Sequence, residues 1–379
     1  MRNIIFLLGK ILFKLFSLLP LKENTIILEC DYGKGFYGNL LYIYNEKINQ
    51  KLSFNIIIPI NRGKKINLKK SKNTRVIKTK SLKHIYYLAT SRYWITNNHY
   101  YYFLKPRKET IFINTWHALG AFKKFGIDSA KNENDIKRFY NEGKNIDYLL
   151  VSSSKLRGIY SKALNVEEKK IISLGVPRTD PLFNNKYKEK VKKRFLHKVE
   201  MMKEKKVILY APTFRDNEKK SFKLKLDLMK MKENLGSNYI VFLKLHPIIR
   251  NEVNIPKEVN NFVFDVKDEN INNLMIVSDI LITDYSSIVF EYSLLKKPII
   301  FYAYDYYEYS KKMRGFYFEY LNFIPGPMVK TTEEVISIIK KNKFDINKIE
   351  QFSKKFCEFQ DCNSAKRFID YFFYNYKCI

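Results

Sequence analysis

Two histidines stand where apolar runs of the sequence end, in positions suited to proton transfer. His117 directly follows the run at 109–116, and His246 ends a second such run. An imidazole titrates near neutral pH, so it can take a proton from an attacking hydroxyl. The small residues Ala118 and Gly120 leave room for a ligand beside His117. A structural histidine that caps a helix is the alternative for His117.

Three basic side chains could bind phosphate. Arg178 projects from a turn that contains Gly175, and a guanidinium matches two phosphate oxygens at once. Lys123 and Lys124 could offset phosphate charge close to His117. A surface salt bridge between Arg178 and Asp180 is the competing explanation for the arginine.

Polar residues also end a run at 205–213 in the second half of the chain. Pro212, Thr213 and Arg215 stand there, and a hydroxyl with free backbone N–H groups suits a nucleotide phosphate or a base edge. Thr213 is equally suited to cap the next helix.

A polar turn follows the later apolar run at 279–285. Ser286 and Ser287 begin a predicted helix whose N–H groups could meet an anion, although ordinary N-capping explains them as well. Glu291 lies one helical turn along, on the side predicted to face this site. A carboxylate repels phosphate, so ribose or polyol hydroxyls are its expected partners.

These polar residues need elements to position them, and the apolar runs predict buried strands that alternate with helices. In the first half the runs lie at 24–30, 54–60, 92–98, 109–116 and 147–153. In the second half they lie at 205–213, 238–247, 261–266, 279–285 and 298–304. Runs that are apolar on both faces indicate parallel sheets covered by helices. We therefore predict an α/β protein with two Rossmann-type halves and a cleft between them, across which the two histidines could face each other.

Changes in composition predict five parts of the chain. They are an amphipathic helix (1–22), an N-terminal Rossmann-like domain (23–185), a charged linker helix (186–204), a C-terminal Rossmann-like domain (205–342) and C-terminal helices that pack back across the domains (343–379). The family resemblance described below implies that the first domain binds the acceptor and the second binds the donor.

The N-terminal segment 1–22 is apolar but interrupted by Lys10 and Lys14. No run in it approaches the roughly 20 apolar residues of a spanning helix. A helix of this kind can lie in the bilayer interface with its lysines at anionic headgroups. Packing on the protein's own core is the alternative.

The chain of 379 residues carries 69 Lys and Arg against 38 Asp and Glu, a net charge of +31. Such a field attracts nucleic acid, acidic headgroups or phosphorylated substrates. Part of the lysine excess reflects a composition rich in Asn, Ile and Lys. Four cysteines without a CxxC pair favour a reducing cytoplasm over a disulfide framework. Walker, GxSxG and zinc signatures are absent from the sequence.

Five segments, taken together and in order, resemble the CDP-glycerol glycerophosphotransferase family of teichoic acid and capsule synthesis. They are GVPRTD (175–180), LYAPTFRD (209–216), KLHP (244–247), LITDYSSIVFEY (281–292) and RGFYFEY with PGP (314–327). The resemblance runs from about Asn114 to Met328.

The resemblance implies a GT-B-like fold in which an acceptor hydroxyl attacks the β-phosphate of a CDP-polyol and expels CMP. It implies that His117 is the general base and that His246 holds or polarises the transferring phosphate. The residues it implies for the CDP-polyol site are Arg178, Pro212, Thr213, Arg215, Lys244, Ser286, Ser287 and Glu291. It also implies a site without a metal or another cofactor.

The sequence departs from the family at Ala118, Leu119 and Gly120, where the best-known glycerol-polymerising members have Gly, Thr and Pro. This form is similar to ribitol-type or capsule-type relatives, which indicates CDP-ribitol or another CDP-polyol as the donor and leaves CDP-glycerol open. The expected acceptor is a lipid-linked saccharide or polymer at the cytoplasmic face of the membrane, to which the enzyme attaches peripherally. A GT-B glycosyltransferase using a nucleotide sugar is the alternative enzyme. Nucleic-acid binding is disfavoured, because the aromatic residues lie in apolar runs without a base-stacking pattern.

Overall fold

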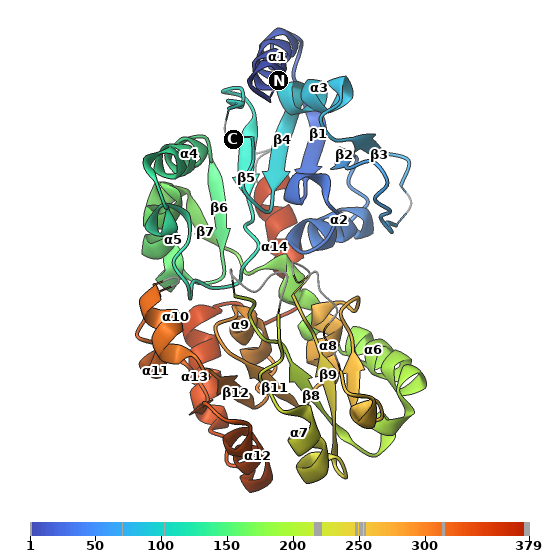
Figure 1. Ribbon diagram of the computed structural model, residues 1–379. Helices are drawn as coiled ribbons and strands as arrows, with labels where there is room; N and C mark the ends of the chain where they lie inside the picture. The colour runs from blue at the N-terminus through green and yellow to red at the C-terminus, as the bar shows by residue number, and fades with distance from the viewer. Residues whose placement is uncertain are drawn as a thin grey trace. The chain divides into compact units, whose positions relative to one another are not determined.

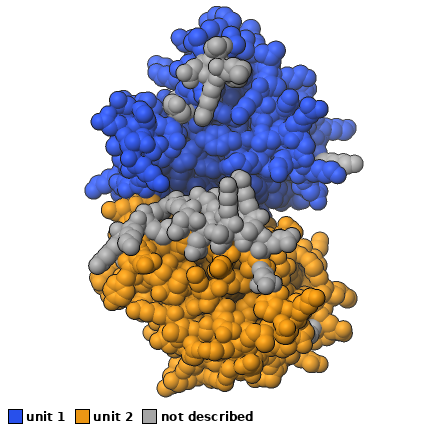
Figure 2. All heavy atoms as spheres, in the orientation of Figure 1, with its two compact units in different colours: residues 1–119, 125–180, 361–379 blue, residues 120–124, 181–360 orange. Residues whose placement is uncertain are grey.

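The computed structural model forms two compact units, each described by itself. Unit 1 comprises residues 1–119, 125–180 and 361–379, and unit 2 comprises residues 120–124 and 181–360 (Figure 2). The structure describes residues 2–69, 71–101, 103–215, 222–246, 249, 253, 255–312 and 315–374. Pro247 and Arg314, which belong to two of the sequence motifs, lie outside the described residues.

Unit 1 is built on a seven-stranded parallel sheet in the order β3-β2-β1-β4-β5-β6-β7 (Figure 1). Its strands are β1 (Lys22–Glu29), β2 (Asn55–Ile60), β3 (Thr74–Lys78), β4 (Ser91–Thr96), β5 (Ile111–Asn114), β6 (Tyr148–Val151) and β7 (Ile171–Ser173). Its α-helices are α1 (Arg2–Phe16), α2 (Asn39–Asn49), α3 (Leu82–Thr90), α4 (Glu133–Lys144), α5 (Arg157–Leu164) and α14 (Ser364–Ile369).

Unit 2 has a six-stranded parallel sheet in the order β10-β9-β8-β11-β12-β13. Its strands are β8 (Lys206–Tyr210), β9 (Tyr239–Leu243), β10 (Val263–Asp265), β11 (Ile280–Thr283), β12 (Ile299–Tyr302) and β13 (Met328–Val329). Its α-helices are α6 (Asn185–Lys198), α7 (Leu228–Leu235), α8 (Ile271–Val277), α9 (Ile288–Ser293), α10 (Tyr306–Lys312), α11 (Tyr320–Phe323), α12 (Thr332–Lys341) and α13 (Ile346–Phe356).

The predicted α/β class with parallel sheets is confirmed. All four residues of β5, β11 and β12 are buried, as expected for central strands covered by helices on both faces. Three edge strands, β3, β7 and β13, were missed. The sequence of β3 is polar and largely exposed, with Val76 52% exposed, and β7 and β13 contain only three and two residues.

Each sheet reverses its strand order once, and the point of reversal is a candidate ligand site. In unit 1 the order turns between β1 and β4, and in unit 2 between β8 and β11. At such a switch point the two crossover connections leave in opposite directions and open a crevice at the carboxyl ends of the strands. The polar residues that follow these strands are therefore the candidate ligand-binding residues.

The C-terminal segment contributes to both units. Helix α13 packs against α9 in unit 2, whereas α14 packs against α2 in unit 1. Phe368 and Phe372 are fully buried in the core of unit 1. Asp180 accepts backbone hydrogen bonds from Ser364 (3.0 Å) and Ala365 (2.8 Å), which fixes the start of α14.

Helix α1 packs against α3 within unit 1 (Figure 1). Phe13 is buried, but Leu7, Leu8 and Leu15 remain more than half exposed. Within the described residues, none of the helices combines the length and the apolar character that a membrane span needs. Attachment of α1 to a bilayer surface stays a prediction.

Candidate functional site

The loop that carries His117 follows β5 and is held in a strained conformation. Trp116 adopts a positive φ of 50°, which is unfavourable for a bulky side chain. Asn114 accepts a hydrogen bond from the Trp116 N–H at 2.8 Å. The Asn39 side-chain amide donates to the carbonyls of Thr115 (2.9 Å) and Trp116 (3.0 Å). These contacts offset the strain and fix the direction in which His117 leaves the sheet.

The structure brings Arg178 and His117 together in unit 1. Arg178 donates from Nη1 to the His117 carbonyl at 2.6 Å, and its backbone N–H donates to Asn39 at 3.1 Å. Asn39 thus braces both residues. In this structure Arg178 supports the His117 backbone; its predicted contact with a donor phosphate stays a prediction.

The imidazole of His117 is kept neutral at pH 7. Desolvation lowers its pKa to about 4, with further lowering by the positive charges of His99 and Arg178. The side chain is nevertheless exposed, and solvent contact works against desolvation, so neutrality at pH 7 is the secure consequence. A hydrogen bond to the backbone of Asn97 acts in the opposite direction. That bond orients the ring and leaves its other nitrogen able to accept a proton.

A second histidine that the sequence analysis missed lies beside His117. His99 follows β4, and its Nδ1 lies 2.6 Å from Oε2 of Glu142 on α4. The His99 ring meets the Trp116 indole edge-on at 5.3 Å, and the His117 ring lies 4.5 Å from the same indole. The position of His99 just after a strand was a usable signal. Glu142 lies 43 residues away in the sequence, so no local pattern indicates the pairing.

The glycine-rich loop 31–38 comes directly after β1. Asp31, Tyr32 and Gly33 have consecutive φ values of 41°, 55° and 76°. The Asp31 carboxylate accepts hydrogen bonds from Asn98 at 2.9 Å and from the Tyr37 hydroxyl at 2.8 Å. We call this loop, residues 97–99, residues 115–117 and Arg178 the His117 rim.

In unit 2 the switch point is organised by a buried arginine. Arg215 is 4% exposed and pairs with Asp284 at 3.0 Å and Asp305 at 2.7 Å. Burial alone would lower the pKa of its guanidinium, but the Asp305 hydrogen bond and the Asp284 charge raise it above the ordinary value. Arg215 therefore braces the loops after β8 and β11, and contact with a donor would require these ion pairs to rearrange.

The other residues predicted at this edge surround that brace. Thr213 donates its backbone N–H to Asp284 at 2.9 Å. Ser286 accepts the Ile288 N–H at 3.3 Å, whereas Ser287 holds the N-cap position of α9 without a capping bond from its side chain. Pro212, Thr213, Ser286 and Ser287 are all half-buried, so each remains partly accessible to a ligand.

His246 is exposed after β9, with its ring 4.7 Å from that of Phe214. Desolvation, and then the charges of Lys123 and Lys244, lower the pKa of His246. The Lys244 ammonium is held by the backbone carbonyls of Lys267 and Glu269. Its role in substrate binding stays a prediction that would require it to leave these carbonyls.

Glu291 differs from its expected setting because its side chain is buried, 2% exposed. Burial first, and then the charge of Glu291, raise the pKa of the Cys357 thiol. The predicted contact of Glu291 with substrate hydroxyls would require an opening of this region.

Directly after His117, the chain enters unit 2 as residues 120–124. A Cβ atom on Gly120 would lie 2.3 Å from the ring of Phe290, so only glycine fits there. Phe122 stacks on Phe316 at 4.8 Å and on Phe323 at 4.7 Å. Its carbonyl accepts the Tyr317 N–H at 3.0 Å. We call residues 120–124 the anchor segment.

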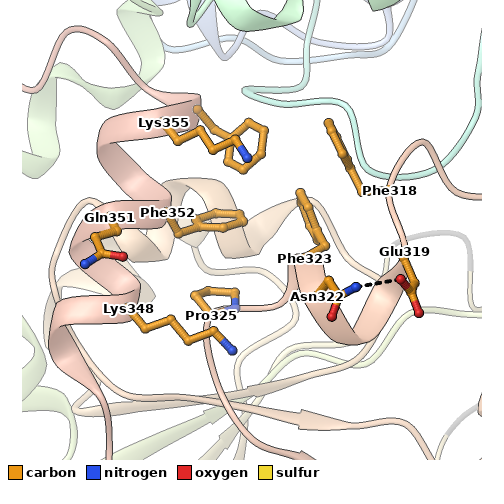
Figure 3. A pocket seen from close by; sticks show the side chains of 10 residues that line it. Phe318, Glu319, Asn322, Phe323, Pro325, Lys348, Gln351, Phe352 and Lys355 are labelled. Atoms are coloured by element: carbon orange, nitrogen blue, oxygen red, sulfur yellow. Dashed lines mark hydrogen bonds between the residues drawn. The ribbon is translucent and has the colours of Figure 1, made fainter.

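A cavity of about 350 Å³ in unit 2 lies apart from all the predicted site residues. Phe318, Phe323 and Phe352 form its apolar surface, and Lys348 and Lys355 lie at its edge (Figure 3). Among the residues that the structure describes, no group of three or more His, Cys, Asp and Glu side chains is arranged to hold a metal ion.

Comparison with known proteins identifies the class. The family model described as CDP-Glycerol:Poly(glycerophosphate) glycerophosphotransferase matches residues 11–374. The chain therefore belongs to this family of transferases.

Two relatives come from Bacillus spizizenii. A teichoic acid poly(ribitol-phosphate) polymerase is 36% identical over 94% of the chain, which spans 57% of that relative's length. A teichoic acid poly(glycerol phosphate) polymerase is 33% identical over 97% of each protein.

The solved structure of the wall teichoic acid polymerase TagF is similar, with a TM-score of 0.87 and 27% identity, over 99% of this chain and 96% of that one. A histidine variant of TagF soaked with CDPG matches with a TM-score of 0.86 and 26% identity, over 99% of this chain and 95% of that one.

Proposed function

We propose that this enzyme transfers glycerol phosphate or ribitol phosphate from a CDP-activated donor to a hydroxyl of a membrane-associated acceptor, releasing CMP. The products serve teichoic acid or capsular polysaccharide synthesis. The observation that carries this proposal is the exposed, neutral imidazole of His117, braced by Arg178 at the switch point of unit 1, in a chain of the glycerophosphotransferase family.

The chemical step is a phosphoryl transfer. The acceptor oxygen forms a bond to the β-phosphorus of the donor, and its proton passes to His117. The bond between that phosphorus and the oxygen bridging to CMP breaks, and CMP leaves with the electron pair. Negative charge develops on the oxygens of the phosphoryl group during transfer. Positively charged groups and N–H donors placed near these oxygens therefore contribute as much to catalysis as the base does.

Unit 2 supplies the donor-binding groups in this proposal. Ser286 and Ser287 provide hydroxyls at the β8/β11 switch point, where nucleotides bind in sheets of this order. Thr213 would join them after a local rearrangement, because its N–H donates to Asp284 and its hydroxyl oxygen is buried. A neutral His246 can donate one N–H to the transferring phosphate. Arg215 acts by holding the loops and makes no contact with the donor in this scheme.

The donor is CDP-glycerol or CDP-ribitol. One of the relatives named above is a poly(ribitol-phosphate) polymerase and the other is a poly(glycerol phosphate) polymerase. The TagF variant was soaked with CDPG. The residues Ala118, Leu119 and Gly120 favour the ribitol-type assignment. The acceptor is a lipid-linked saccharide or polymer, which the exposed apolar side chains of α1 help the enzyme to reach at the cytoplasmic membrane surface.

A donor comparison tests this proposal against a nucleotide-sugar glycosyltransferase, which the family match does not favour. Purified protein receives CDP-glycerol, CDP-ribitol or a UDP-sugar, each with a lipid-linked acceptor extract. We expect acceptor-dependent release of CMP from one or both CDP-polyols and no UDP from the sugar donor. Release of UDP with no CMP would overturn the proposal.

A further inference from the structure

His99 and Glu142 form an oriented pair in the His117 rim. Nδ1 of His99 and Oε2 of Glu142 are 2.6 Å apart, and the Glu142 side chain is only 7% exposed. Arg138 lies 3.7 Å from the other carboxylate oxygen. An ionised carboxylate can only accept, so Nδ1 carries the hydrogen. The lone pair of a neutral His99 is therefore on Nε2.

The rest of the ring is fixed by packing. His99 lies between Trp116 at 5.3 Å and Phe139 at 5.1 Å between ring centroids. The His117 ring lies 4.5 Å from the same indole, measured between ring centroids. The two imidazoles thus belong to one surface, and both are positioned by Trp116.

A second histidine–glutamate pair in unit 1 shows what a purely structural arrangement looks like. His84 and Glu29 are 2.7 Å apart, and both side chains are 1% exposed. Nδ1 of His84 accepts the Lys80 N–H at 2.9 Å, so both ring nitrogens are used inside the protein. His99 differs on both counts. Its side chain is 27% exposed, and its Nε2 has no hydrogen-bond partner in the described part of the chain.

The exposed atom decides which ligand would suit this pair. A neutral Nε2 accepts a hydrogen bond, so it selects a hydroxyl and not a phosphate oxygen. The neighbouring carboxylate of Glu142 also disfavours an anion. Saccharides and polyols carry hydroxyls on adjacent carbons. If His99 holds one hydroxyl, the hydroxyl on the adjacent carbon would lie close to His117.

We propose that His99 is an acceptor-binding residue. Its Nε2 accepts a hydrogen bond from an acceptor hydroxyl close to the one that His117 deprotonates, and Glu142 is the positioning residue that sets the tautomer and the direction of the ring. This inference rests on the proposed transferase function and adds recognition of the acceptor to it. No bond is made or broken at His99.

The test replaces His99 by Asn, whose side-chain amide can still donate to Glu142 but lacks the outer nitrogen. The probe acceptor is a short lipid-linked saccharide ending in a glycerol phosphate unit, with whichever CDP-polyol the wild type uses. Loss of one neutral hydrogen bond is worth about 1 kcal/mol, or about a 5- to 10-fold increase in the acceptor KM. We expect the donor KM to stay unchanged and kcat to change less than threefold.

His84→Asn is the matched control, since it disrupts a similar pair that solvent does not reach. It should lower the melting temperature and leave the acceptor KM unaltered. Glu142→Gln keeps an acceptor oxygen for Nδ1, so it should raise the acceptor KM less than Glu142→Ala.

Calorimetric titration of the same acceptor without any donor separates this inference from the reaction. Weaker acceptor binding by His99→Asn supports the inference even if the wild type transfers no polyol phosphate, in which case only the proposed function fails. Equal acceptor binding by wild type and His99→Asn would overturn it. A loss confined to kcat would do so too, because His99 would then act only through His117.

Discussion

At the scale of single residues, the neutral state of His117 is the property on which the proposed chemistry depends. Desolvation and the positive charge of Arg178 keep the proton off the ring. A base that is already neutral at pH 7 needs no activation before it receives the acceptor proton. His246, with a pKa lowered by desolvation and by Lys123 and Lys244, is neutral at the same pH.

The pH dependence of turnover follows from this shift. A lowered pKa means that the base becomes protonated only on the acid side of the usual histidine value of 6.5. We expect kcat/KM to stay level from pH 7.5 to 6.5 and to fall at lower pH.

The substitution His117→Ala should lower kcat at least 100-fold and leave donor binding unchanged. An acid limb centred above pH 7, or near-normal turnover by His117→Ala, would contradict the assignment.

At the scale of elements, the anchor segment links the base to the other unit through the chain itself. Only Ala118 and Leu119 separate His117 from Gly120, whose backbone packs against the fully buried ring of Phe290. That ring is confined by Phe352 at 5.3 Å and Phe356 at 5.7 Å, so it cannot move aside easily. The anchor segment is therefore held firmly within unit 2.

Gly120→Ala tests the fit of this segment. Overpacking of a confined core contact costs about 1–3 kcal/mol, so we expect a lower free energy of unfolding in urea titrations. Gly158→Ala on α5 is the control, because its Cβ would make an ordinary contact of 3.5 Å with Glu168 and alanine favours the helix. If both variants unfold at the same urea concentration as the wild type, Gly120 is not confined as described.

The sequence predicted elements better than it predicted contacts. Apolar runs located the central strands, and polar residues after them located His117, Ser286 and Ser287, because parallel strands end at one edge. Burial of Arg215 could not be read in this way, since its partner Asp305 lies 90 residues away. The His99–Glu142 pair was missed for the same reason, because such contacts depend on tertiary packing and leave no local pattern.

At the scale of the whole molecule, we expect both the net charge of +31 and the helix α1 to favour binding to an anionic membrane surface. Leu8 and Leu15 are 54% and 55% exposed on α1, and Lys10 and Lys14 are exposed between them. Apolar side chains can enter a bilayer interface while lysines meet anionic headgroups. We therefore predict that this helix binds to an anionic membrane surface.

Vesicle sedimentation tests this surface. Leu8→Gln combined with Leu15→Gln changes only exposed side chains, so the fold should be kept while binding to vesicles of anionic lipid falls at least several-fold. Deletion of residues 1–20 should abolish that binding. Neutral vesicles serve as the control for the charge contribution. Unchanged binding by both variants would show that attachment lies elsewhere.

The central claim is that one polyol phosphate moves to the acceptor for each CMP released. Both products can be measured in one reaction, CMP by chromatography and the new phosphodiester on the acceptor by mass spectrometry. We expect equal amounts of CMP and of the phosphodiester with wild-type protein, and neither product above background with His117→Ala. CMP formed without a phosphodiester on the acceptor, or transfer that survives loss of His117, would contradict it.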